Sequence, residues 1–234
     1  TLQPRHPPPP ARTSGSVSGW TLVIPVRGGA GKSRLVVPDI DRAALARAIG
    51  LDTIAAAQAC PAVAQVVVVT ADAEIAREIS DGCLVVTDPG TGLNDAVRAG
   101  LAVTDAAQPR AAMLGDLPAL RATDLETVLV AAARYESAAL PDAEGTGTTL
   151  ITRTVAGELV PAFGEDSFTR HRAAGFLDLA REIDAGRQQR GAWSARRDVD
   201  TLDQLHEAAQ LGLGIRTAAL LEGRSRQGAA SSVA

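Results

Sequence analysis

The sequence predicts an α/β fold: one Rossmann-like domain, with a mostly parallel sheet and helices on both of its faces. Short apolar runs rich in valine and isoleucine alternate along the chain with segments of helical periodicity. Such runs are typical of buried parallel strands, and the helical segments supply the crossovers that parallel strands need. The length of 234 residues suits one domain of this kind and is short for two. In such a sheet, ligands bind beyond the carboxyl ends of the strands.

The chain divides into a central domain and two tails. Residues 1–19 include His6 and a run of prolines followed by serine and glycine, a composition that cannot bury a core. We expect residues 1–19 to be a disordered tail, residues 20–222 to form the domain, and residues 223–234 to be a flexible tail.

A glycine-rich loop follows the first expected strand. Gly28, Gly29 and Gly31 let the backbone turn tightly and leave amides that suit an anion. Lys32 is the only lysine among 23 basic residues, and its ammonium group on a flexible stem suits a polyphosphate. A surface lysine without a role is the alternative. The loop is not a Walker P-loop, because Val26 stands where that motif needs its first glycine.

The other elements follow in regular order. Periodicity predicts helices over 39–59, 72–80, 93–102, 123–134 and 202–211, and strands over 20–26, 65–70, 83–87, 110–118 and 145–152. Asp41 is a candidate cap for the first helix, and Pro118 ends the fourth strand. The turn before the third helix holds Gly92 and Asn94. Asn94 is able to contact a base or ribose; the alternative is that Asn94 or Asp95 merely caps the helix.

Three aspartates are candidate metal ligands. Asp116 follows Gly115 at the mouth of the sheet, where a turn-forming role is the alternative. Asp198 and Asp200 lie two residues apart in an expected strand, so their carboxylates point to the same side. Capping of the next helix by Asp200 or Thr201 is the competing interpretation. Three such carboxylates suffice for one or two Mg²⁺ ions in a site completed by phosphates and water.

Two further segments suit an anion. Residues 145–149 combine two glycines with three threonines and lead into a strand; their hydroxyls and amides are able to bind a carboxylate or phosphate, and a plain turn is the alternative. Gly164 and Ser167 open an expected helix whose first turn carries a positive dipole. Arg170, His171 and Arg172 add charge nearby, although such a cluster is typical of a solvated helix face.

Six motifs in one order make the sequence similar to a known family. They are Val-Ile-Pro-Val with Lys-Ser-Arg-Leu, Gly-Leu-Asn-Asp-Ala, Gly-Asp-Leu-Pro-Ala-Leu, Gly-Thr-Gly-Thr-Thr, Phe-Gly-Glu-Asp-Ser and Asp-Val-Asp-Thr, over about residues 20–215. The chain resembles the 2-phospho-L-lactate guanylyltransferase family, whose actinobacterial members use phosphoenolpyruvate. The resemblance implies a Rossmann-like nucleotidyltransferase domain and a role in the biosynthesis of the deazaflavin coenzyme F-420.

The resemblance also implies roles for individual residues. Thr148, Gly164 and Ser167 look like the ligands of the phosphorylated three-carbon acid. The metal ligands would be Asp116, Asp198 and Asp200, binding Mg²⁺; Gly28, Gly29, Gly31, Gly92 and Asn94 would contact GTP. Lys32 looks like the triphosphate contact and, with Arg34, would stabilise the leaving pyrophosphate. The opening loop is about one residue shorter than the family form, which leaves the role of Arg27 open.

Alternatives remain for substrate and class. The acceptor is phosphoenolpyruvate by this interpretation, with 2-phospho-L-lactate and 3-phosphoglycerate as alternatives that differ by small groups. A cytidylyl- or uridylyltransferase has the same scaffold, and a nucleotide-binding protein without turnover is a rival from another class.

Composition limits the partners. The net charge of −4 argues against a nucleic-acid or membrane surface, so an anionic ligand must be met by a few cations or by metal. Cys60 and Cys83 lack metal-site spacing, which favours a reducing, cytoplasmic setting. No apolar stretch reaches the roughly 18 to 20 residues of a membrane span. The oligomeric state stays open, a homo-oligomer included.

Overall fold

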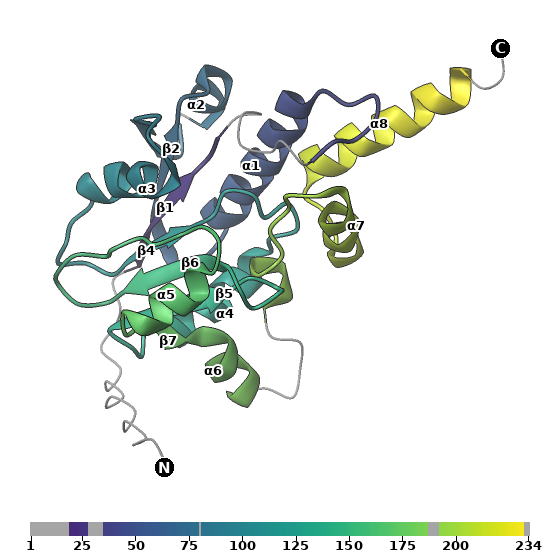
Figure 1. Cartoon of the computed structure of the whole chain (residues 1–234). Coiled ribbons are helices and arrows are strands. Elements are labelled where there is room, and N and C mark those ends of the chain that lie inside the picture. Colours follow the sequence, from purple (N-terminus) through teal and green to yellow (C-terminus); the bar gives the residue numbers. More distant parts are fainter. Residues whose placement is uncertain (1–18, 28–34, 80, 187–191, 232–234) are drawn as a thin grey trace.

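A seven-stranded mixed sheet forms the centre of the protein (Figure 1). The computed structural model describes residues 19–27, 35–79, 81–186 and 192–231. The strands lie in the order β3-β2-β1-β4-β6-β5-β7. Their bounds are β1 Trp20–Pro25, β2 Val63–Thr70, β3 Leu84–Thr87, β4 Arg110–Met113, β5 Ser137–Pro141, β6 Thr148–Arg153 and β7 Leu177–Asp178. Only β6 runs against its neighbours, because it pairs antiparallel with both β4 and β5. The expectation of a mostly parallel sheet is confirmed.

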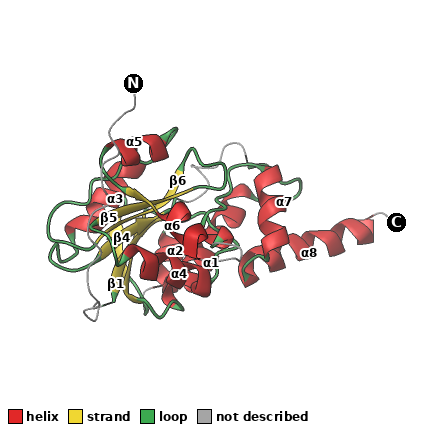
Figure 2. Cartoon of the chain, turned by 90° about the horizontal axis from the view of Figure 1, so that it is seen from below, coloured by secondary structure: helices red, strands yellow, loops and turns green. Residues whose placement is uncertain are grey.

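Helices cover both faces of the sheet, as expected (Figure 2). They are α1 Arg42–Gln58, α2 Ala73–Ile79, α3 Leu93–Ala102, α4 Ala122–Ala132, α5 Ser167–Ala173, α6 Leu179–Gly186, α7 Leu202–Leu211 and α8 Ile215–Ser231, with a short 3₁₀ helix, η2, at Trp193–Ala195. One buried cluster joins one face of the sheet to α1, α2, α4 and α6. A second cluster joins the other face to α3 and to phenylalanines in and beside α5. The alternation of side chains along each strand produces these two layers.

Local capping fixes several helix ends. The Asp41 carboxylate accepts a hydrogen bond from the amide of Ala44, 2.8 Å away, so the predicted cap of α1 is confirmed. Thr201 and Gln204 form a reciprocal capping box at the start of α7. The cap of α7 is therefore Thr201 and not Asp200.

Two expectations need correction. The strand predicted over 110–118 ends at Met113, and the chain then turns at Gly115 and Asp116. No strand forms at Asp198 and Asp200, where the described backbone is irregular. Within the tails, α8 continues to Ser231 across much of the segment predicted as a flexible C-terminus, and residues 1–18 and 232–234 lie outside the described part.

Gly115 lets the backbone before Asp116 pass close to β1. A Cβ atom on Gly115 would lie 2.5 Å from the carbonyl oxygen of Pro25 and 2.8 Å from Cγ2 of Val26. Real Cβ atoms do not approach this closely, so the backbone must move if any side chain is added. The position of Asp116 thus depends on the absence of a Cβ atom at Gly115.

We expect Gly115→Ala to lower the free energy of unfolding by about 1–3 kcal/mol, because the added methyl group overpacks a rigid contact. Urea unfolding measures the change. Gly223→Ala is the matched control, since Gly223 lies in α8 with no heavy atom within 4 Å of an added Cβ. It should raise stability by up to about 1 kcal/mol. An unchanged unfolding curve for Gly115→Ala would contradict the close contact.

Candidate active site

A cleft of about 550 Å³ opens at the carboxyl ends of the parallel strands. Six of the residues predicted to bind substrate or metal line it together: Asp116, Thr148, Gly164, Ser167, Asp198 and Asp200. Residues from loops after β1, β4 and β5 also contribute to the wall. Because β6 is antiparallel, its first residue, Thr148, reaches the same edge at which the parallel strands end. The cleft therefore combines the predicted metal ligands and acid ligands in one cavity.

The remaining predicted residues do not line this cleft or cannot be placed. Gly28, Gly29, Gly31, Lys32 and Arg34 lie outside the described residues, so their roles stay predictions. The loop is described only at its two ends. At the near end, exposed Arg27 lines the cleft, and its Nε lies 3.3 Å from the carboxylate of Asp88.

Asp198 is the centre of a group of negative charges. Burial, together with the neighbouring carboxylates of Asp116, Asp142 and Asp200, raises the pKa of its carboxyl group to about 8. One carboxylate oxygen of Asp198 is buried and has no hydrogen-bond partner among the described residues. An ionised carboxylate in such surroundings is unstable unless a cation compensates it.

Two acidic residues that the sequence analysis passed over join this group. Asp142 and Glu144 follow β5. One carboxylate oxygen from each of Asp142, Glu144 and Asp198 lies within 4.8 Å of the other two. The sequence feature that could have identified Asp142 is its place directly after the apolar run ending at Pro141. All these donors are hard oxygen ligands of the kind that Mg²⁺ or Mn²⁺ binds, so the residues fit a divalent cation.

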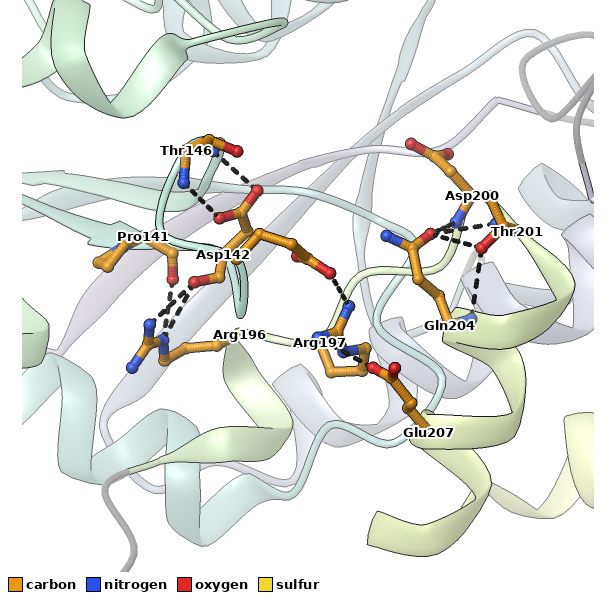
Figure 3. A network of polar contacts seen from close by, with 11 residues as sticks. Pro141, Asp142, Thr146, Arg196, Arg197, Asp200, Thr201, Gln204 and Glu207 are labelled. Atoms are coloured by element: carbon orange, nitrogen blue, oxygen red, sulfur yellow. Dashed lines mark hydrogen bonds and ion pairs between the residues drawn. The ribbon is translucent and has the colours of Figure 1, made fainter.

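Asp142 and Glu144 also have structural partners, which Figure 3 shows. The Asp142 carboxylate accepts hydrogen bonds from the amides of Thr146 and Gly147, at 2.9 and 2.7 Å. Glu144 forms an ion pair with Arg197 at 2.6 Å. The loop between β5 and β6 is therefore folded around its own acidic side chains, and Thr148 follows this loop directly.

Two arginines hold the irregular segment that carries Asp198 (Figure 3). Arg196 donates to the carbonyl oxygens of Pro141 and Asp142, at 3.2 and 2.9 Å, and its guanidinium lies 4.9 Å from the centre of the Trp193 ring. Arg197 is buried and joins Glu144 to Glu207 of α7. These contacts replace the strand pairing that the sequence led us to expect.

Backbone bonds bring the predicted metal ligands together. The amide of Val199, between the two aspartates, donates to the carbonyl oxygen of Asp116 at 3.1 Å. The amide of Asp200 donates to the side-chain oxygen of Gln204 at 2.8 Å. Together with the contacts of Arg196 and Arg197, these bonds fix the chain on both sides of Asp198 and bring it close to the segment of Asp116 and to the loop after β5.

The lining of the cleft also includes two residues with buried hydroxyl groups. Thr148 is 2% exposed and Ser167 is 1% exposed, and the Ser167 Oγ has no hydrogen-bond partner among the described residues. The first amides of α5 are already engaged, because Ser167 donates to the carbonyl of Gly164 and Phe168 to that of Thr146. The hydroxyl groups of Thr148 and Ser167, and not these amides, are therefore the groups available to a ligand.

Asn94 has a structural role that the sequence did not indicate. Its side-chain oxygen accepts from the amide of Phe163 at 2.8 Å, and its side-chain nitrogen donates to the Phe163 carbonyl at 3.1 Å. The N-cap of α3 is Gly92, which makes no side-chain cap, so helix capping by Asn94 is wrong. Neither Asn94 nor Gly92 is among the cleft-lining residues, and their contact with a nucleotide stays a prediction.

The expected cationic face of α5 is only partly present. Arg170 donates to the carbonyls of Glu165 and Ala162, and Arg172 donates to that of Phe176. His171 is fully buried, and its pKa is lowered to about 4, mainly by burial and also by the charge of Arg170; a hydrogen bond to the Ser167 backbone opposes the shift. His171 is therefore neutral at pH 7.

Comparison with known proteins identifies the family. The family model described as "Guanylyl transferase CofC like" matches residues 20–222, most of the chain. The chain belongs to this family. Its enzyme class is therefore nucleotidyltransferase, as the sequence predicted. Among the described residues, no helix is long and apolar enough to cross a membrane.

Several relatives of this CofC-like chain have the same name. It is 51% identical to the phosphoenolpyruvate guanylyltransferase of Streptomyces coelicolor, over 86% of this chain and 95% of the relative. The enzyme of the same name from Salinispora arenicola is 47% identical over 86% of this chain and 92% of its own.

Solved structures agree with the fold of the CofC-like chain. A putative nucleotide-diphospho-sugar transferase from Desulfovibrio desulfuricans has a TM-score of 0.53 at 18% identity, covering 88% of this chain and 95% of its own. A nucleotidyl transferase from Methanothermobacter has a TM-score of 0.50 at 15% identity, and the match covers 83% of this chain and 98% of that protein. At these identities the likeness concerns the fold.

Replacing Asp198 by asparagine should raise stability in the absence of metal and reduce the stabilisation that metal gives. We expect Asp198→Asn to unfold at a higher temperature than the wild type without metal at pH 8, because one repelling charge is removed. Millimolar Mg²⁺ or Mn²⁺ should raise the melting temperature of the wild type by several degrees and that of the variant by much less.

Differential scanning fluorimetry with and without metal measures both effects. Asp203→Asn removes an exposed carboxylate of α7 outside the cleft and serves as the control. Equal metal stabilisation of Asp198→Asn and the wild type would exclude Asp198 as a ligand.

The buried His171 should make stability fall in acid. Between pH 6.5 and about 4 the unfolded chain binds a proton at His171 that the folded chain does not, so unfolding becomes easier as pH falls through this window. The full difference is about 3 kcal/mol. Urea unfolding at pH 7 and 4.5 should show a larger loss for the wild type than for His171→Gln; equal losses would contradict the low pKa.

Proposed function

We propose that the protein transfers GMP from GTP to the phosphate group of phosphoenolpyruvate, forming enolpyruvoyl-diphospho-guanosine and pyrophosphate for the biosynthesis of coenzyme F-420. The names of relatives at 51% and 47% identity support this choice of acceptor. The observation on which the proposal rests is the cleft itself, which is lined by a cluster of carboxylates and by two buried hydroxyl-bearing residues. Both cysteines are free thiols, in keeping with a cytoplasmic enzyme.

Two groups of residues divide the work. Asp116, Asp198 and Asp200 would hold Mg²⁺, with Asp142 and Glu144 close to the same point. Thr148, Gly164 and Ser167, which line the same cleft, would bind the phosphorylated acid. We further propose that Lys32 and Arg34, in the glycine-rich loop, contact the triphosphate.

The chemistry requires positioning more than acid or base catalysis. An oxygen of the acceptor phosphate attacks the α-phosphorus of GTP in line, and the bond from that phosphorus to the β-phosphate oxygen breaks. The attacking oxygen is already anionic, so no general base is needed. His171, the histidine beside the cleft, is consistent with this, since both of its ring nitrogens are hydrogen-bonded within the protein.

The main obstacle is repulsion between two anionic substrates. Asp116, Asp198 and Asp200 would hold a Mg²⁺ ion, whose positive charge would offset this repulsion and the charge on the leaving pyrophosphate. The protein supplies the carboxylates that fix the position of this charge, and the arginine contacts at Arg196 and Arg197 fix the carboxylates. A displaced carboxylate would misplace the reacting groups, which costs rate steeply.

Pyrophosphate release with GTP, Mg²⁺ and phosphoenolpyruvate tests the proposal. The wild type should turn over, Asp198→Asn should lose activity by at least about a thousandfold, and Lys32→Ala by about a hundredfold or more, because each removes charge that the transition state needs. Both variants should remain folded by circular dichroism.

Substrate exchange completes the test. Replacing phosphoenolpyruvate by 2-phospho-L-lactate or 3-phosphoglycerate, or GTP by CTP or UTP, should give lower kcat/KM in every case. A higher value for another acid or nucleotide would reassign the substrate, and absence of turnover with every pair would refute the enzyme assignment. Asp203→Asn should retain wild-type rates.

A further inference from the structure

His171 connects the three residues proposed to bind the phosphorylated acid. It lies on α5, one turn after Ser167, and its side chain is completely buried. Its Nδ1 is 3.0 Å from the hydroxyl oxygen of Thr148, at the start of β6. Its Nε2 is 3.0 Å from the backbone nitrogen of Ala162, two residues before Gly164. One imidazole ring therefore contacts both β6 and the loop before α5.

The contact with Ala162 determines which nitrogen carries the proton. A backbone N–H can only donate, so Nε2 of His171 must accept with its lone pair. The ring is neutral at pH 7, because burial holds its pKa near 4, and its single proton must then lie on Nδ1. The backbone carbonyl of Ser167, which also interacts with the ring, suits a donor at this position.

The tautomer in turn sets the direction of the Thr148 hydroxyl group. The Nδ1–H group of His171 donates to the Thr148 oxygen, so the hydroxyl proton of Thr148 cannot be directed at His171. Within the described part of the chain, this hydroxyl group has no other hydrogen-bond partner. Thr148 lines the cleft, and an acceptor atom of a ligand there is the natural partner for its proton.

The surroundings keep this arrangement fixed. The rings of Phe163 and Phe176 pack edge to face against the imidazole, with centroid distances of 5.5 and 5.3 Å. The Asn94 side chain bonds to both the amide and the carbonyl group of Phe163, and Arg170 donates to the Ala162 carbonyl at 3.0 Å. Because the ring cannot rotate or gain a proton easily, it is a permanent donor to Thr148.

We propose that His171 is a positioning residue for the acceptor: by donating to Thr148, it makes the Thr148 hydroxyl group a dedicated hydrogen-bond donor for the anionic acid. The inference rests on the proposed function and deepens it. Ser167, whose buried Oγ has no partner among the described residues, supplies a second hydroxyl group in the lining of the same cleft. Two neutral donors recognise an ionised carboxylate or phosphate oxygen and leave an uncharged group in that position unfavoured.

Two variants of His171 provide the sharpest test, because each keeps a polar group at the position of one ring nitrogen and loses the other. The side-chain amide of Asn reaches the position of Nδ1, and that of Gln reaches the position of Nε2. We expect His171→Asn to keep the KM for phosphoenolpyruvate within about threefold. His171→Gln should raise this KM tenfold or more, with the KM for GTP unchanged. Equal rises in both KM values, or a larger effect of Asn than of Gln, would overturn the proposal.

Substitutions of Thr148 test whether His171 acts through it. Thr148→Ser keeps the hydroxyl group and should keep the KM for phosphoenolpyruvate within about threefold, whereas Thr148→Val should raise it tenfold or more. In Thr148→Val, the further change His171→Gln should add less than twofold. Full additivity of the two effects would show that His171 has only a structural role.

Nuclear magnetic resonance separates this inference from the proposed function. Long-range ¹⁵N–¹H correlation spectra of the full wild-type chain at pH 7 report the tautomer directly, with no need for turnover. We expect His171 to carry its proton on Nδ1; a proton on Nε2 would overturn the inference even if pyrophosphate is released from GTP and phosphoenolpyruvate. Lack of pyrophosphate release with the Nδ1 tautomer present would instead refute the proposed function.

Discussion

Repulsion among the carboxylates around Asp198 is the constraint on which the site depends. Asp198 lies near Asp116, Asp142 and Asp200, and its burial and these neighbours, which together raise its pKa, make the cluster unstable without a compensating cation. Such a group persists only where the backbone is held from several directions. Here the amide of Val199 bonds to the carbonyl of Asp116, and the arginines at 196 and 197 bond to the loop after β5. Folding free energy from the rest of the domain therefore maintains a site that is electrostatically unfavourable by itself.

The cleft is lined by both charged and neutral groups. Negative side chains concentrate where a cation would be shared with two substrates. The groups proposed to contact the acid are neutral: the hydroxyl groups of Thr148 and Ser167, with the imidazole of His171, whose pKa is lowered to about 4, behind Thr148. A positive side chain in their place would bind the acid more strongly but less selectively, because a charge attracts any anion. Neutral donors with fixed directions discriminate by geometry.

The sequence predicted the fold well because its signals were local. Valine-rich runs marked the strands, and α3 has the predicted bounds, Leu93–Ala102. It also predicted that Asp116, Asp198 and Asp200 share the cleft, although only Asp116 follows a strand as expected and Asp142 was missed. Other features depended on contacts distant in sequence. The pairing of Asn94 with Phe163, 69 residues away, leaves no local pattern, and neither do the arginine contacts that replace a strand at Asp198. His171 resembled part of a solvated cationic face because only burial distinguishes it from its arginine neighbours.

The reversed direction of β6 affects how this architecture can diversify. In a fully parallel sheet, each ligand-binding loop is separated from the next by a strand and a crossover helix. Here one continuous stretch, from Asp142 to His171, enters the cleft before β6, leaves along it and returns through α5. The proposed acid ligands are therefore encoded together in about thirty residues, whereas Asp116 and the glycine-rich loop precede them. Recombination at Pro141 and at the end of α5 would exchange the acceptor half of such an enzyme as a unit, leaving its nucleotide half in its original sequence context.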